Sequence, residues 1–189
     1  MSICKKLIAG LSLGCESTIN KRYAQEVVLI NKDDIATVTK TISADTKYSH
    51  NVTFDLKASA KGFKFILPAN GSGVFGSVEK STSDLGLTQY NHIANMLIFG
   101  ADETSKGVLE SLDKGRMIAV LKIGDIIEVY GIDNGLSTAD YTLDIQGGAG
   151  ASAIQLSSGE GFEESNLPLV YTAGVGGDPL ADFDSAFAG

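Results

Sequence analysis

The sequence RMIAVLKIGDIIEVYGIDNGL, residues 116–136, decides which kind of fold to expect. It contains two short apolar runs, RMIAVLK (116–122) and DIIEVYGI (125–132), that have the length and composition of buried β-strands. We expect them to form a hairpin through Ile123 and Gly124, because glycine between two apolar runs is typical of a turn. The Asn-Gly pair in the DNGL that follows has the chemistry of another tight turn.

The same two-residue periodicity extends along much of the chain. It predicts a short buried strand at EVVLI (26–30) and a strand at KGFKFIL (61–67) that ends at the turn PANGSG. YSHNVTFDL (48–56) alternates most cleanly, with one face made of Tyr48, His50, Val52, Phe54 and Leu56. QYNHIANMLIF (89–99) is apolar on both faces toward its end, which predicts burial on two sides.

Three further segments have weaker signals. NKDDIATVTK (31–40) carries Asp33 and Asp34 ahead of a short stretch that is compatible with a helix. SAIQLSS (152–158) predicts a strand, and LPLVYT (167–172) predicts a short strand at the edge of a sheet.

One segment, DETSKGVLESLDKG (102–115), has the pattern of an α-helix. Asp102 is placed as an N-cap, and Gly115 as the stop. The apolar stripe of this helix consists of Val108, Leu109 and Leu112. With about eight or nine predicted strands to this one helix (about residues 102–114), the fold class is mainly β: a sandwich or barrel of two sheets with a flanking helix.

The length and composition fit one domain with extended ends. At 189 residues and 43% hydrophobic, the chain can bury a core. We divide it into an N-terminal arm (1–22), a β-sandwich or barrel domain (23–173) and an acidic, glycine-rich C-terminal tail (174–189). The tail carries three acids and two isolated phenylalanines, and we expect it to be mobile or docked on a neighbouring molecule. Its removal would then leave a folded domain.

The first residues, MSICKKLIAGLSLGCES (1–17), share some features with a lipoprotein signal, because two lysines precede an apolar octapeptide and Cys15. That octapeptide barely reaches the lower limit of about 7–15 apolar residues, and its glycines and Ser12 weaken its helicity. We therefore favour an arm or strand of the mature protein. One side of it would carry Leu7, Ala9, Leu11 and Leu13.

The formal net charge of −8 argues against a surface that binds nucleic acid, because an acidic chain repels phosphates. A channel wall that DNA passes without adhering would also be acidic. No apolar run approaches the about 18–20 residues that span a bilayer, so we expect no membrane partner.

The residues that most often bind metals are few. Cys4 and Cys15 lack the spacing of a zinc site and are too few for a disulfide framework, so we interpret them as buried or unpaired thiols. His50 and His92, the two histidines, each occur in a Tyr-x-His sequence. Two ligands do not complete a site, so we expect no metal and two side chains that pack at strand ends with hydrogen-bonded or hydrated tips.

One glycine-rich stretch matches G-x-G-x-x-G at Gly71, Gly73 and Gly76. A dinucleotide site needs a helix after this motif, and the residues that follow have no helical stripe. We interpret the stretch as the tip of a hairpin and expect no cofactor.

No catalytic pattern occurs in the context that its chemistry needs. H-E-x-x-H is not found, and the one G-x-S-x-G match, GLSLG (10–14), lies in the predicted N-terminal arm and not in a turn from a strand into a helix. The acid pairs Asp33/Asp34 and Glu163/Glu164 fall in predicted loops, where adjacent acids are ordinarily solvated surface. We therefore predict no catalytic residues and a protein that is not an enzyme.

A larger pattern extends from about residue 86 to residue 171. A strand with Tyr90 and His92 precedes the acid-capped helix, and then come DKGRMIAVLK, IIEVYGIDNGL and a glycine-rich segment leading to IQLSSGEGFEESNLPLVY. This order resembles the tail tube (major tail) proteins of tailed bacteriophages, especially virion proteins of phages that infect Bacteroidetes. KGR entering an apolar strand, and VYG followed by DNGL, carry most of the resemblance, which covers about half of the chain.

The resemblance implies two β-sheets flanked by one helix, in a subunit that assembles into hexameric rings stacked as a hollow tube. Its partners would be copies of itself and other virion proteins, with DNA passing through the lumen and no sequence-specific nucleic-acid binding. The virion would be assembled in the cytoplasm of a host bacterium. A head–tail connector or auxiliary capsid protein with the same fold is one alternative, and an exported β-sandwich binding module or surface lipoprotein is another.

Overall fold

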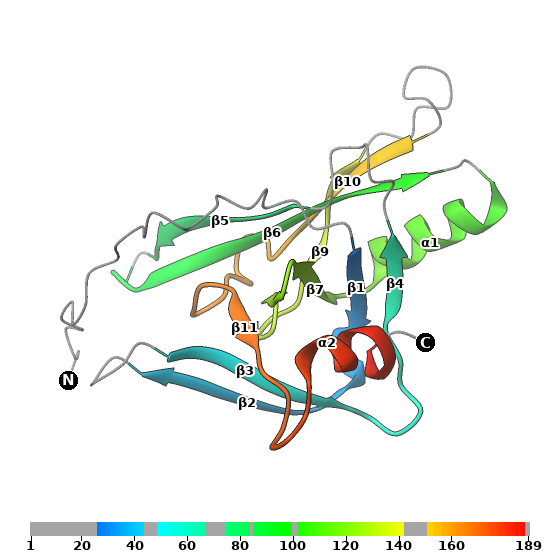
Figure 1. Ribbon diagram of the computed structural model, residues 1–189. Helices are drawn as coiled ribbons and strands as arrows, with labels where there is room; N and C mark the ends of the chain where they lie inside the picture. Colours follow the sequence, from blue (N-terminus) through cyan, green and yellow to red (C-terminus); the bar gives the residue numbers. More distant parts are fainter. Residues whose placement is uncertain are drawn as a thin grey trace, which may run out of the picture.

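The computed structural model describes residues 26–43, 49–66, 75–83, 85–99, 102–141 and 151–187. Within these ranges the chain is mainly β, with two sheets and few helices (Figure 1). The predicted fold class, two sheets with a flanking helix, is confirmed. The predicted arm at residues 1–22, both cysteines and the turn PANGSG lie outside the described residues.

The larger sheet has seven strands in the order β2-β3-β11-β8-β7-β1-β4. Their bounds are β1 Glu26–Asn31, β2 Ile35–Ser43, β3 Ser49–Leu56, β4 Phe63–Ile66, β7 Met117–Ile123, β8 Ile126–Tyr130 and β11 Leu169–Tyr171. Neighbouring strands are antiparallel except β11 and β3, which run parallel. The predicted hairpin is β7–β8, and Gly124 in its turn has a φ of +61° that favours glycine.

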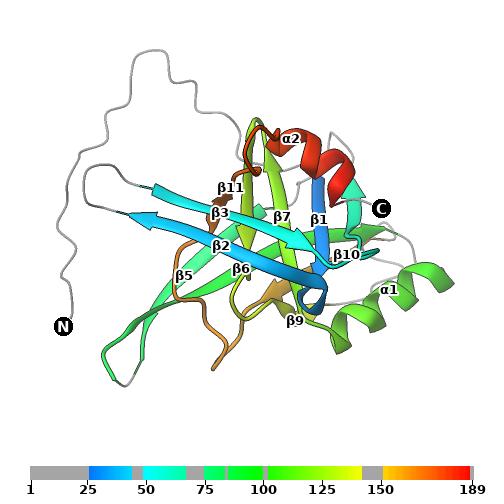
Figure 2. The same cartoon turned by 90° about the horizontal axis from the view of Figure 1, so that it is seen from below.

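The smaller sheet has four antiparallel strands in the order β5-β6-β10-β9. Their bounds are β5 Phe75–Thr82, β6 Thr88–Phe99, β9 Ser137–Tyr141 and β10 Ala151–Ser157. The β5–β6 and β2–β3 hairpins belong to different sheets but extend toward the same side of the molecule (Figures 1 and 2).

The core has two parts, one on each face of the larger sheet. On β7, Ala119 and Leu121 face the smaller sheet and α1, whereas Ile118 and Val120 face the opposite way. All four are fully buried. Burial on both faces explains why the apolar runs of β1 and β7 are continuous instead of alternating.

The predicted helix is confirmed as α1, Glu103–Lys114, with Asp102 as its N-cap. The Asp102 carboxylate accepts the Ser105 backbone N–H at 2.7 Å, which satisfies one of the free donors of the first turn. Leu109 and Leu112 are buried against the core between the sheets. The helix therefore closes one end of the sandwich (Figure 1).

The segment after Asp34 is a strand, so the interpretation of a short helix there is wrong. Lys32–Asp34 forms one 3-10 turn, and Ile35–Ser43 then pairs with β3 along its length as β2. The β-branched residues of IATVTKTIS suit a pleated strand better than a helix.

The short apolar run at Leu169–Tyr171 predicted a strand at the edge of a sheet, and this prediction is wrong. The strand lies inside the larger sheet between β3 and β8. Leu169 and Tyr171 are buried, because this position places them under the C-terminal segment and beside β3.

The C-terminal segment packs against its own domain, so the prediction of a tail that is mobile or docked on a neighbour is wrong for residues 174–187. It forms α2, Pro179–Ala181, and a π-helical turn η2, Asp182–Ala186. Phe183 and Phe187 are buried in the core, and the Phe187 ring stacks on Phe54 with centroids 4.8 Å apart. Deleting this segment would expose that core.

Two lysines of the larger sheet also hold the C-terminal segment. Lys64 of β4 and Lys122 of β7 place their Nζ atoms 3.0 and 3.2 Å from the Asp184 carboxylate. Both ammonium groups lie over the Phe183 ring. The ion pairs fix the direction of the segment, and the buried rings supply most of its attachment.

Candidate functional site

A cluster of charged and polar side chains lies where the β8–β9 turn (131–136) meets the β10–β11 loop (158–168). The turn comes directly after β8, and the loop returns the chain from the smaller sheet to the larger one. We call the following side chains the polar junction: Lys40, His92, Arg116, Asp133 and Glu164.

Glu164 is the most deeply buried acid of the junction, with 1% of its surface exposed. Its two carboxylate oxygens accept the backbone N–H groups of Asp133 and Asn134, both at 2.8 Å. Burial raises the pKa of Glu164, and these two hydrogen bonds act in the opposite direction. The side chain thus provides an acceptor for two backbone donors of the turn.

His92, on β6, is also 1% exposed. Its Nδ1 accepts the Gly131 N–H at 3.1 Å, so Nε2 carries the proton and donates to the Asn166 carbonyl at 2.8 Å. Burial lowers the pKa of His92 to about 4, which keeps the ring neutral near pH 7. One imidazole therefore joins the turn to the loop.

Asp133, within the turn, connects it to β2 and to the β10–β11 loop. The Asp133 carboxylate pairs with the Lys40 ammonium of β2 and accepts the Ser165 hydroxyl at 2.8 Å. Burial acts to raise the pKa of Asp133, but these hydrogen bonds outweigh it and the pKa lies below its ordinary value.

The Arg116 guanidinium reaches three backbone carbonyls. It donates to Asn134 at 2.5 Å, to Gly135 at 2.8 Å and to Ser158 at 2.9 Å. The Phe162 ring lies 4.1 Å from the guanidinium carbon. Arg116 therefore connects the start of β7, the turn and the loop.

The chemistry of the polar junction is structural. The acceptors and donors named above are committed to partners in the same chain, at hydrogen-bonding distances. A group that must bind or transform a ligand needs free valences toward a cavity. We therefore assign the junction the role of fixing the β8–β9 turn against the β10–β11 loop.

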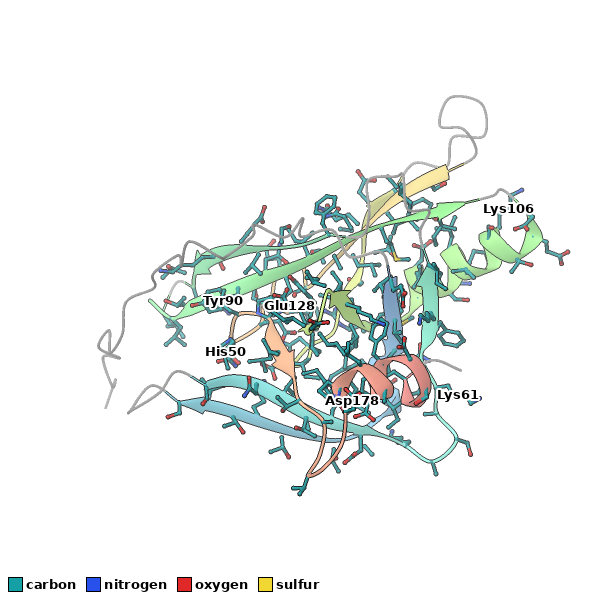
Figure 3. All side chains as sticks on the ribbon, in the orientation of Figure 1. His50, Lys61, Tyr90, Lys106, Glu128 and Asp178 are labelled. Atoms are coloured by element: carbon teal, nitrogen blue, oxygen red, sulfur yellow. The ribbon has the colours of Figure 1, made fainter. Side chains whose placement is uncertain are left out.

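The two histidines that stand out in the sequence contact the same loop. His50 Nε2 lies 3.1 Å from the Leu167 carbonyl, next to the Asn166 carbonyl that His92 reaches. His50 and Tyr90 lie toward the side from which the two hairpins extend (Figure 3). Across the ranges that the structure describes, no three His, Cys, Asp or Glu side chains are grouped so that they could hold a metal ion.

The loop position of Glu163/Glu164 predicted two solvated acids, and this prediction is wrong for Glu164. Glu164 is buried because its carboxylate serves the turn, whereas Glu163 remains half-buried. In the other pair, Asp33 is exposed and Asp34 accepts the Asn31 side-chain amide at 2.8 Å.

Gly76 is the described member of the glycine motif, since Gly71 and Gly73 lie outside the described residues. It belongs to β5, so the residues after the motif form a strand instead of the helix that a dinucleotide site needs. A Cβ atom at Gly76 would lie 2.2 Å from Cζ of Tyr130. The glycine is required there because the Tyr130 ring packs directly on the strand.

Most of the polar junction could not be identified from the sequence. Lys40, Arg116, Asp133 and Glu164 match no catalytic or ligand-binding motif and come together only in the folded chain. The one local signal was the Asn-Gly turn of DNGL, which gives the position of the turn but not its partners.

The margins of the two sheets are the second candidate site. Among the described strands, β2, β4, β5 and β9 each have a neighbour on one side only. We call these four strands the sheet margins. They carry large exposed apolar side chains, which are Val38 on β2, Phe63 and Ile66 on β4, and Phe75 on β5.

A groove lies beside the β4 margin, between that strand and α1. Its volume is about 610 Å³. The lining residues are Leu29, Asn31, Phe63, Phe65, Thr104, Gly107, Val108, Ser111, Leu112 and Met117. We call this the α1–β4 groove; most of its side chains are apolar.

Neither helix in the described part of the chain has the length and apolar character needed to cross a membrane. We also compared the chain with known proteins. A scan against protein-family models, a search of curated proteins and a search of solved structures each found no match.

Proposed function

We propose that this chain is a structural protein that assembles with copies of itself through the sheet margins, as a tail tube subunit of a tailed bacteriophage. The observation that carries the proposal is that the margin strands have a neighbour on one side only among the described strands, and that three of the four carry large exposed apolar side chains. The phage context comes from the resemblance of residues 86–171 to tail tube proteins.

Proteins that stay monomeric protect their sheet edges with charges, proline or a covering element. β4 is short and carries Lys64, but it also exposes large apolar side chains, since Phe63 is 58% exposed and Ile66 is 70% exposed. β5 likewise begins with Phe75, 43% exposed. An unpaired strand that carries apolar side chains is a template for pairing with another strand.

The smaller sheet is suited to ring formation. Its two margins, β5 and β9, lie at opposite ends of the strand order. A contact between β9 of one copy and β5 of the next uses two different surfaces, so it repeats head to tail and gives a ring when the rotation between copies closes. A ring of such sheets is a continuous barrel without a free edge. The hexameric number is taken from the resemblance.

The charge of the chain is compatible with a conduit for DNA. The formal net charge is −8, and an acidic wall repels the phosphates of DNA whatever the DNA sequence. DNA could then pass through the lumen without sequence-specific binding. The expected location is the virion.

The test is the assembly state of the purified full-length chain. Light scattering after gel filtration and negative-stain electron microscopy over a range of concentrations should give rings or tubes. Isolated rings that never stack would favour a connector or an auxiliary capsid protein. A monomer at every concentration would contradict self-assembly.

The exported binding module needs a separate measurement. Mass spectrometry of protein made in its native setting should find no acylated N-terminus at Cys15. A chain that begins at modified Cys15 would contradict the virion role and favour a surface lipoprotein.

A further inference from the structure

We propose that the tip of the β5–β6 hairpin of one copy inserts Leu85 and Leu87 into the α1–β4 groove of a second copy. This contact rests on the self-assembly proposed above and adds an interface that sheet pairing alone does not provide. In this contact the α1–β4 groove of one copy binds the β5–β6 tip of another.

The tip is the most exposed apolar part of the smaller sheet. Leu85 is 86% exposed and Leu87 is 63% exposed. Leucine side chains at the end of a long hairpin have no role in the stability of their own copy. The free-energy cost of exposing Leu85 and Leu87 to water is removed when an apolar surface of another copy covers them.

Hydrogen bonds hold the tip in one shape. The Ser83 N–H donates to the Leu87 carbonyl and the Gly86 N–H donates to the Ser83 carbonyl, both at 2.8 Å. The Leu87 N–H also donates to the Ser83 hydroxyl at 3.1 Å, and Gly86 has a φ of +76°. Because these hydrogen bonds already fix Ser83, Gly86 and Leu87 relative to one another, little conformational freedom of these residues is lost on docking.

The groove is kept open by Gly107. This glycine lies in the middle of α1, where it destabilises the helix relative to alanine. A Cβ atom built on it would meet nothing within 4 Å, and the residue lines the groove. Most side chains here would favour the helix and extend into the groove, and no contact within the described chain requires a glycine, so the open position suits the occupant proposed here.

The tip and the groove of one copy cannot meet. The β5–β6 turn and α1 lie at opposite ends of the molecule in both views (Figures 1 and 2). A contact between them therefore joins two copies through different surfaces, and it repeats from copy to copy. The apolar lining, with Phe63, Phe65 and Met117, matches the leucines in chemistry.

The first test fills the groove with Gly107→Leu. Replacing a helical glycine should leave the melting temperature unchanged or raise it, so failure to fold would not explain a loss of assembly. We expect the concentration for half-assembly to rise by at least about tenfold. The matched control is Lys106→Leu, on the neighbouring exposed position of α1 outside the groove lining (Figure 3), which should assemble like the original chain.

The second test mixes two variants. Leu85→Asp/Leu87→Asp keeps its groove and loses its tip, whereas Gly107→Leu keeps its tip and loses its groove. Fluorescently labelled copies of the two should bind each other at least about tenfold more tightly than either binds itself. A contact between identical surfaces would not give this pattern.

The outcomes separate the two proposals. If the original chain assembles and both variants assemble at the same concentration, the tip-in-groove contact is overturned and self-assembly stands. If the two variants bind each other no better than themselves, the contact is likewise overturned. A monomeric original chain would overturn both.

Discussion

The polar junction and the sheet margins reverse the usual placement of side chains. The junction buries an acid and a histidine between two loops, each with 1% of its surface exposed. The β4 margin leaves a phenylalanine and an isoleucine more than half exposed. In the first region, hydrogen bonds within the chain compensate for the burial of polar groups. In the second, apolar side chains stay exposed, and the proposed assembly would cover them.

The two regions therefore contribute to different free energies. Loss of a partner in the junction leaves a buried donor or acceptor unsatisfied, which lowers the stability of a single copy. Loss of an apolar side chain at a margin changes little in a single copy, because water already contacts that side chain. Four substitution experiments separate these contributions, each at a concentration where the protein is monomeric unless stated.

The largest effect on stability is expected from Phe183→Ala, compared with the same substitution at Phe63. Phe183→Ala removes a fully buried ring and should lower the free energy of unfolding by about 3–5 kcal/mol. Phe63→Ala removes a ring that is 58% exposed and should cost about 0.5 kcal/mol or less. Urea denaturation measures both. Equal losses would show that the β4 margin belongs to the core of the single copy.

Glu164→Ala should lower the free energy of unfolding by about 2–4 kcal/mol, because the N–H groups of Asp133 and Asn134 lose their acceptor. The adjacent Glu163→Ala is the control, since that side chain is half-buried, and it should change stability by about 0.5 kcal/mol or less. Two similar values would contradict the role assigned to Glu164.

His92 gives the junction a pH dependence. Its pKa is about 4 in the folded chain and 6.5 ordinarily, so between these values only the unfolded chain binds the proton. Its contribution to stability is complete above pH 6.5 and falls as the pH falls toward 4, by about 3 kcal/mol at most. Glu164, whose pKa is raised, acts in the opposite direction and is present in every variant compared.

The measurement is urea denaturation of His92→Gln, His50→Gln and the original chain between pH 5 and 6.5, where most carboxylates stay ionised. The loss of stability with falling pH should be smaller in His92→Gln than in the original chain. His50→Gln is the control and should keep the original slope. An unchanged slope in His92→Gln would refute the buried neutral imidazole.

The smallest effect on stability is expected from Ile66→Lys. The residue is 70% exposed at the β4 margin, so the free energy of unfolding should change by about 0.5 kcal/mol or less. Assembly should nevertheless weaken, because charged residues protect sheet edges from pairing. Val175→Lys, in the exposed loop between β11 and α2 and outside the four margin strands, is the control and should leave assembly unchanged. Light scattering compares the two.

Local periodicity was sufficient for the elements that pack by their own pattern. β3 alternates, β1 and β7 are continuously apolar, and α1 has a cap and a stripe, so their sequences predict them. The two-sheet fold follows from these elements. Each signal lies within about a dozen residues, the range over which secondary structure repeats.

Position within a sheet and burial of loops depend on distant partners, and here sequence reasoning failed. β11 is interior because β3 and β8 leave a gap that it fills, although its three residues are typical of an edge. Phe183 and Phe187 look isolated in the sequence but meet Phe54 and Tyr171 in space. Nothing in the neighbouring sequence distinguishes Glu164 from Glu163. Glu164 is buried because its carboxylate accepts two N–H groups of the distant β8–β9 turn.

The central position of β11 also constrains how the chain is made. β3 is synthesised early, yet its partner on one side ends at Tyr171, near the C-terminus. At roughly 5–20 residues per second, a nascent chain waits several seconds on the ribosome with that side of β3 open. Such a long-range parallel pair closes late and slowly. A subunit that joins its neighbours through strand edges, as proposed here, must therefore finish its own sheet before it meets them, and chaperones that shield the open side of β3 would favour the correct order.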